Sequence, residues 1–254
     1  MNKKILFTFL LSGSALAHRP YFSEGAHSVQ DEAFFVEDPE ISMVLYGELT
    51  CEEDQLWLSF ETEPDFDLYV QLGVPEIGWL EDFRPSMALL HPDLPTADED
   101  LPFTVPEGMG VQVWHSEESS MADDFYEPFT QTSSWIWQEE TVALESGGEG
   151  YVVAWNPEGW TAKVWLAVGT VEDFSGVDWS EFGTWGAKVN EFHETGGEIG
   201  ESTYCEPEAV DEEDESETMA EEGGCSTTGG SSSPMAPSVL LGLGLLLRRR
   251  GDRE

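Results

Sequence analysis

The chain has 254 residues, and its 52 acidic and 10 basic side chains give a formal net charge of −42 at pH 7. A surface of this charge repels nucleic acid and anionic lipid, which argues against both as partners. We interpret the acidity as a solvated, salt-tolerant surface. A calcium-dependent surface is the alternative, although the nearest approach to a calcium loop, residues 65–67, alternates along a strand instead of enclosing an ion.

The first 17 residues predict a secretory signal peptide. Lys3 and Lys4 form a positive start, residues 5–11 an apolar run, and residues 15–17 a small-x-small cleavage site. The apolar run is too short to span a bilayer. We therefore expect export, cleavage after Ala17, and a mature chain that begins at His18.

Residues 18–205 predict one all-β domain. Apolar and polar residues alternate with period two in several short segments, so that Leu56, Leu58 and Phe60 share one face, and Pro and Gly clusters separate these segments. The pattern is typical of a β-sandwich or jelly roll. Residues 171–194 have helical spacing, and we expect a short helical segment there, broken around Gly183 and Gly186. The expected strands are 41–49, 56–60, 66–72, 111–114, 134–137, 141–144, 151–155 and 163–168.

Three of these segments carry a family resemblance. The stretch Asp65-Phe66-Asp67-Leu68-Tyr69-Val70, together with residues 150–155 and 163–169, resembles paired strands of bacterial pre-peptidase C-terminal-type domains. Those domains are accessory β-sandwiches of secreted proteins. The resemblance therefore implies a sandwich without catalytic activity of its own.

Two cysteines lie in the folded region. An oxidising compartment favours pairing of Cys51 with Cys205, and neither has metal-ligand spacing or a C-x-x-C partner. We expect a structural disulfide. Loop-closure entropy gives a ring of this length a stabilisation of roughly 5 kcal/mol.

A copper site is the sharpest alternative to a purely structural role. An N-terminal His18 offers an amine and an imidazole, and a second imidazole from His27, His91, His115 or His193 would complete a histidine brace, a ligand set that suits copper(II). The competing interpretation is structural: His115 caps a strand and His193 lies on a helix surface.

Signatures of catalysis are mostly missing from the sequence. It contains no G-x-S-x-G elbow, H-E-x-x-H pair or phosphate-binding glycine loop. A two-carboxylate hydrolase stays open, because so acidic a chain offers many carboxylate pairs.

Aromatic residues and a solitary cation are further candidates. Trp135 and Trp137 share one strand face and could stack on sugar rings, so extracellular polysaccharide or a surface protein is a candidate partner. Most other tryptophans, Trp57, Trp155 and Trp165 among them, are expected to fill the sandwich core. The scarce cation Arg84 is expected to form a buried ion pair.

The C-terminal region predicts a stalk and an anchor. Residues 206–222 hold ten acids in seventeen residues, so residues 206–233, with their Gly/Ser spacer, form a disordered stalk. In residues 234–254 an apolar run at 236–247 precedes three arginines; twelve helical residues rise about 18 Å, short of the roughly 30 Å hydrocarbon layer. Without residues 1–17 and 225–254, four basic and fifty acidic residues remain, which gives a net charge near −46.

This tail resembles a known sorting signal. Gly223, Gly224 and Cys225, followed by the short apolar run and the arginine cluster, are similar to the MYXO-CTERM signal of myxobacteria. The resemblance implies processing at Cys225 and display at the cell surface through a membrane or lipid anchor. The sequence as a whole predicts a non-catalytic, surface-anchored acidic sandwich for recognition or envelope architecture, with the copper protein and the hydrolase as alternatives.

Overall fold

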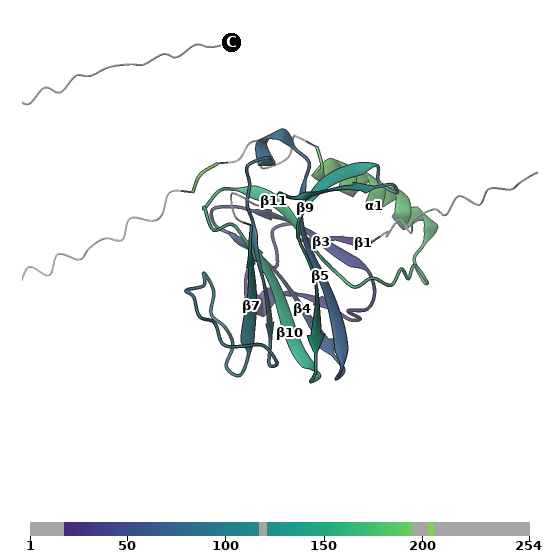
Figure 1. Ribbon diagram of the computed structural model, residues 1–254. Coiled ribbons are helices and arrows are strands. Elements are labelled where there is room, and N and C mark those ends of the chain that lie inside the picture. The colour runs from purple at the N-terminus through teal and green to yellow at the C-terminus, as the bar shows by residue number, and fades with distance from the viewer. Residues whose placement is uncertain (1–17, 117–120, 195–202, 206–254) are drawn as a thin grey trace, which may run out of the picture. The chain divides into compact units, whose positions relative to one another are not determined.

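The computed structural model describes residues 18–116, 121–194 and 203–205 as two β-sheets packed face to face, with one helix (Figure 1). The chain divides into two units, Met1–Glu208 and Ala209–Glu254. The second unit, the expected signal peptide and the sorting residues Gly223, Gly224 and Cys225 lie outside the described residues. The expected all-β sandwich with a short C-terminal helix is confirmed.

The first sheet has six strands in the order β1-β3-β11-β5-β9-β8. Its pairs are antiparallel except for β1 and β3, which run parallel. The strands are β1 (Arg19–Phe22), β3 (Met43–Leu49), β11 (Ala162–Val168), β5 (Phe66–Pro75), β9 (Thr132–Leu144) and β8 (Asp123–Glu127).

The second sheet has five strands in the order β2-β4-β10-β6-β7, with β2 parallel to β4 and the other pairs antiparallel. Its strands are β2 (Phe34–Val36), β4 (Gln55–Thr62), β10 (Gly148–Trp155), β6 (Ser86–His91) and β7 (Gly110–His115). Two short 3-10 helices, η1 (Gln30–Glu32) and η2 (Gly78–Leu80), occur in the connections.

The main core lies between the sheets and follows the period-two pattern. Leu56, Leu58 and Phe60 of β4 face Leu68 and Leu72 of β5, and all five side chains are at most 2 % exposed. Burial of large apolar side chains at roughly 1.5–3 kcal/mol each is the main stabilising contribution. The expectation that these alternating residues share one face is confirmed.

Each sheet is also covered on its outer face. Helix α1 (Trp179–Phe192) packs Val189 and Phe192 against Trp165 of the six-stranded sheet. Residues 92–109 cross the five-stranded sheet and cover Trp57 and Trp155 with Leu101, Phe103, Val105 and Met109. The three tryptophans are buried as expected. They pack in these outer layers, however, and not between the sheets, because neighbouring residues of a strand point to opposite faces.

Several expected boundaries were wrong. The segments 134–137 and 141–144 belong to one strand, β9, and β5 continues through Gly73 to Pro75 with a register shift at Leu72/Gly73. Helix α1 runs without a break through Gly183 and Gly186. An interior glycine costs a helix only about 1 kcal/mol, and packing of Val189 and Phe192 on the sheet offsets that cost.

Helix α1 begins after an N-cap residue, Asp178. The Asp178 side chain accepts a hydrogen bond from the Ser180 amide, which satisfies one of the free amides of the first turn. The same hydrogen bonds from Ser180 lower the pKa of the Asp178 carboxyl. This cap stabilises the start of the helix, and the packing of Val189 and Phe192 on the sheet positions its last turn.

The expected disulfide is present. Cys51, in the turn between β3 and β4, is bonded to Cys205, and their Cα atoms lie 5.3 Å apart. The chain around Cys205 is also held by backbone hydrogen bonds, from Cys205 to Gly159 and from Thr161 to Thr203. Residues 203–205 are therefore fixed on the turn between β10 and β11.

Candidate functional site

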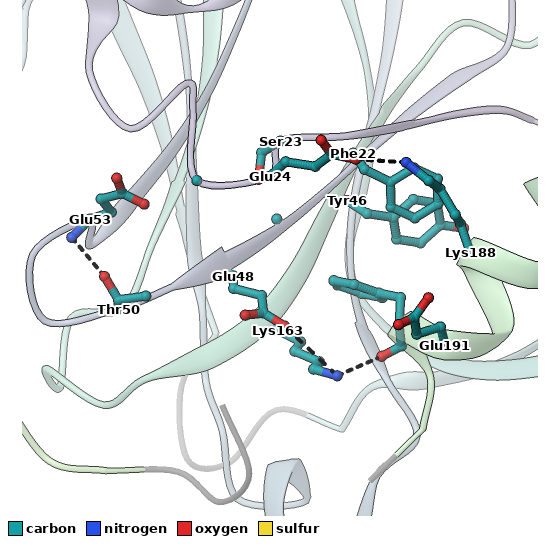
Figure 2. Close-up of a pocket in the computed structure, with 13 residues that line it drawn as sticks. Phe22, Ser23, Glu24, Tyr46, Glu48, Thr50, Glu53, Lys163, Lys188 and Glu191 are labelled. Carbon is teal, nitrogen blue, oxygen red and sulfur yellow. Dashed lines mark hydrogen bonds and ion pairs between the residues drawn. The ribbon is translucent and has the colours of Figure 1, made fainter. Parts of the chain in front are cut away.

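A cleft of about 610 Å³ opens on the outer face of the six-stranded sheet (Figure 2). Four separate segments line it: residues 22–25 at the end of β1 and beyond it, residues 46–53 of β3 and the following turn, Lys163 of β11, and the last turns of α1. A volume of this size is in the range of ligand-binding clefts.

Aromatic rings form the floor of the cleft. Phe22 stacks on Tyr46 with ring centroids 5.2 Å apart, and Phe192 of the helix meets Tyr46 edge-on at 4.9 Å. Burial, with a smaller contribution from Glu127, raises the pKa of the Tyr46 phenol. The Tyr46 hydroxyl therefore stays protonated at all physiological pH values.

A lysine and a glutamate form an exposed pair at the cleft. The Lys188 Nζ donates to the Glu24 Oε1 at 2.6 Å and lies 5.3 Å from the centroid of the Phe22 ring. The hydrogen bond from Lys188 lowers the pKa of the Glu24 carboxyl. The two side chains are 45 % and 70 % exposed, so the pair lies in water, where such contacts contribute little to stability.

The second lysine of the cleft is buried. Lys163 is 1 % exposed, and its Nζ donates to the carbonyls of Phe192 at 3.1 Å and Glu194 at 3.3 Å. The same Nζ lies 3.9 Å from the Glu48 Oε1. Burial lowers the pKa of the Lys163 ammonium, and the neighbouring Glu48 partly offsets this effect. These bonds satisfy carbonyls at the helix C-terminus, where a positive charge also interacts favourably with the helix dipole.

The charge of the cleft is negative overall. Four glutamates and two lysines line it. Lys188 pairs with Glu24 and Lys163 with Glu48, whereas no Lys or Arg of the described residues lies within ion-pair distance of Glu53 or Glu191. An aromatic floor with a surplus of carboxylates can hold a cation through charge and through the ring faces.

The candidate copper ligands have separate partners. His18 Nδ1 shares a hydrogen bond of 2.5 Å with Ser42 Oγ, and burial lowers the pKa of His18 to about 4. His27 Nδ1 donates to the Glu32 carbonyl at 2.6 Å, in the loop after β1. Neither contact involves a second histidine.

The other two candidates lie on the five-stranded sheet. His91, fully buried at the end of β6, accepts a hydrogen bond from the Asp93 amide, and burial lowers its pKa. His115, the last residue of β7, bonds Ser86 and Glu99, each at 2.9 Å. In the described part of the chain, no three His, Cys, Asp or Glu side chains are grouped to hold a metal ion.

His193 was expected on the helix surface, and that was wrong. It caps α1 and turns inward, with Nδ1 donating to the Val189 carbonyl at 2.7 Å and Nε2 3.0 Å from Ser134 Oγ. Burial lowers its pKa to about 4. His193 therefore joins the helix to strand β9.

Trp135 and Trp137 share a face of β9, as expected, but that face packs partly buried against the main core. The Arg84 guanidinium lies 4.3 Å from the centroid of the Trp137 ring. The expected ion pair of Arg84 was wrong: its Nη1 donates to the carbonyls of Glu81 and Phe83. Arg84 therefore already covers one side of the Trp137 ring.

The sequence interpretation missed the lysines of the cleft. Lys163 carried a usable signal, because it is a charged residue within an otherwise apolar strand, between Ala162 and Val164. A charge in such a position requires a partner. Lys188 and Glu24 carried no comparable signal, since they are 164 residues apart and meet only in the fold.

Comparisons with known proteins show no close relative. No protein-family model and no curated protein matches the sequence. Among solved structures, the pre-peptidase C-terminal domain of a collagenase from Bacillus anthracis matches with a TM-score of 0.28 and 10% identity, over 53% of this chain and 92% of that domain. Within the described residues, no helix is long and apolar enough to cross a membrane.

Proposed function

We propose that the protein is an exported, surface-anchored binding domain without catalytic activity, and that its ligand contacts the cleft above the six-stranded sheet. The observation that carries this proposal is the construction of the cleft. Segments from residues 22–25, 46–53, 163 and 188–192 meet there outside the main core, and they combine an aromatic floor with charged walls. Such a combination is typical of recognition sites.

Export and anchoring are supported by the two ends of the sequence. The positive start, the apolar run and the Ala-x-Ala site support secretion, and the disulfide between Cys51 and Cys205 suits an oxidising compartment. The glycines before Cys225, the short apolar run and the arginine cluster support sorting to the cell surface. Recognition outside the cell is the role that fits these features together.

The hydrolase alternative has less support. It requires a cleft that holds a carboxyl with a raised pKa. Burial does raise the pKa of Glu127, at the end of β8, but Glu127 does not line the cleft. The cleft carboxyl of Glu24 has the opposite shift.

The copper alternative also has less support. It requires a second imidazole beside His18, and the partner of His18 is Ser42, the residue before β3. Calcium binding has no specific support beyond the acidic composition.

Surface display is tested by following the full chain in a producing cell. We expect wild-type protein to be accessible to protease added to intact cells, and Cys225→Ser protein to lose surface retention and appear in the medium or an inner fraction. Ser226→Ala is the matched control, because it alters the adjacent residue without removing the thiol. Wild-type protein that stays inside the cell with an uncleaved Met1 would refute the proposal.

A further inference from the structure

We propose that the ligand of the cleft is a basic polypeptide segment, one of whose Lys or Arg side chains displaces Lys188 from Glu24 and Phe22. The inference rests on the proposed function and names the class of ligand for the same site. The structure supplies three independent reasons.

The first reason is charge. The cleft has four carboxylates and two ammonium groups, and two of the carboxylates, those of Glu53 and Glu191, lie beyond ion-pair distance of every described Lys and Arg. Figure 2 shows Glu53 on one side of the cleft and the Glu24–Lys188 pair on the other. A segment with two cationic side chains could therefore contact carboxylates on both sides. The strongly acidic chain would also attract such a segment over a longer range.

The second reason is the way the aromatic rings are used. Lys188 lies over Phe22 at 5.3 Å, and Lys163 lies over Phe192 at 5.4 Å. Tyr46 also stacks on Phe22, with ring centroids 5.2 Å apart. A sugar ring needs an open aromatic face, whereas an ammonium or guanidinium needs only the position that Lys188 now holds. The rings therefore favour a cationic ligand over a neutral polysaccharide.

The third reason is the difference between the two lysines. Lys163 is buried and holds two carbonyls at the end of α1, so it is part of the fold. Lys188 lies on the exposed side of the helix, and its pair with Glu24 is open to water. An exposed ion pair is weak, so a ligand cation can replace the lysine at little cost. Lys188 thus occupies the site in the absence of ligand.

The test uses the full chain in the processed form in which its host displays it, labelled with 15N. The probe is the capped peptide acetyl-Lys-Gly-Lys-amide at physiological salt, with acetyl-Gln-Gly-Gln-amide as the uncharged control. We expect saturable amide shift changes confined to residues 22–25, 46–53 and 188–192 with the lysine peptide, and none with the glutamine peptide.

Variants separate site binding from general charge attraction. Glu24→Gln should weaken binding about two- to fivefold, and Lys188→Met should strengthen it by a similar factor, as expected for one exposed ion pair. Glu61→Gln, an exposed residue of β4 on the other sheet, removes the same charge and should leave binding unchanged. Equal weakening by Glu24→Gln and Glu61→Gln, or shift changes spread over the whole surface, would overturn the inference.

The class of ligand can fail without the proposed function failing. If a neutral N-acetylglucosamine trimer shifts the cleft amides and the lysine peptide does not, the inference of a basic polypeptide is wrong while the cleft remains a binding site. The cell-surface experiment with Cys225→Ser tests the proposed function independently of either probe.

Discussion

The disulfide between Cys51 and Cys205 gives the most quantitative prediction. The bond joins residues 154 apart, so it closes a ring that contains most of the folded domain. Loop-closure entropy at this length corresponds to about 5 kcal/mol of stabilisation at 25 °C. Because unfolded chains retain some structure, we expect the double variant Cys51→Ser/Cys205→Ser to lose about 3–5 kcal/mol of unfolding free energy.

Urea denaturation monitored by tryptophan fluorescence measures this loss. The urea dependence of the unfolding free energy should also become steeper, because an unfolded chain without the cross-link exposes more surface. Cys225→Ser is the control, since Cys225 lies outside the ring, and it should leave stability unchanged. A loss below about 1 kcal/mol would show that residues 203–205 do not belong to the cooperative fold, contrary to our reasoning.

Three further predictions concern other parts of the fold. Lys163→Met should lower the unfolding free energy by about 2 kcal/mol, because the carbonyls of Phe192 and Glu194 lose a charged donor. A urea denaturation curve identical to that of the wild type would contradict this prediction. Burial lowers the pKa of His18 and His193 to about 4, so unfolded histidine takes up protons from about pH 6.5 downward before the folded protein does. Stability should therefore fall between pH 6.5 and 4, by on the order of 3 kcal/mol per histidine, and His193→Gln should flatten this dependence. An equally steep profile in the variant would exclude His193 as a cause. Gly110→Ala should lower the unfolding free energy by about 2–3 kcal/mol, because a Cβ there would overlap the Leu94 carbonyl. Gly78→Ala, whose Cβ would meet open space, should leave the unfolding free energy nearly unchanged. Equal melting temperatures for the two variants would refute the packing of residues 92–109.

The sequence predicted strands in which strongly apolar residues recur at every second position. Period-two alternation located β4 and β5, whose inward residues fill the core. It did not locate β6, whose central residues Met87–Leu90 form a continuous apolar run without alternation. The parallel pairs of β1 with β3 and of β2 with β4 were missed as well, because strands of three or four residues carry too little pattern.

The layers outside the main core were also beyond prediction. Alternation reports which residues share a face, but not what covers that face. Trp57 and Trp165 are buried only because residues 92–109 and helix α1 fold over the two outer surfaces. These coverings also create the cleft, since one of its walls belongs to α1.

The candidate site was therefore predicted only in part. The disulfide followed from the cysteine count and the expected compartment. The cleft depends on contacts between distant segments, such as the pair of Glu24 with Lys188, and short-range patterns in one sequence do not report such contacts. Lys163 was the single residue whose sequence context indicated a special environment.

Export and surface anchoring can be tested together by the intact mass and N-terminal sequence of protein released from the surface of intact cells. We expect a chain that begins at His18, carries the bond between Cys51 and Cys205, and is processed at Cys225. A chain that begins at Met1 and is recovered only from the cell interior would contradict it.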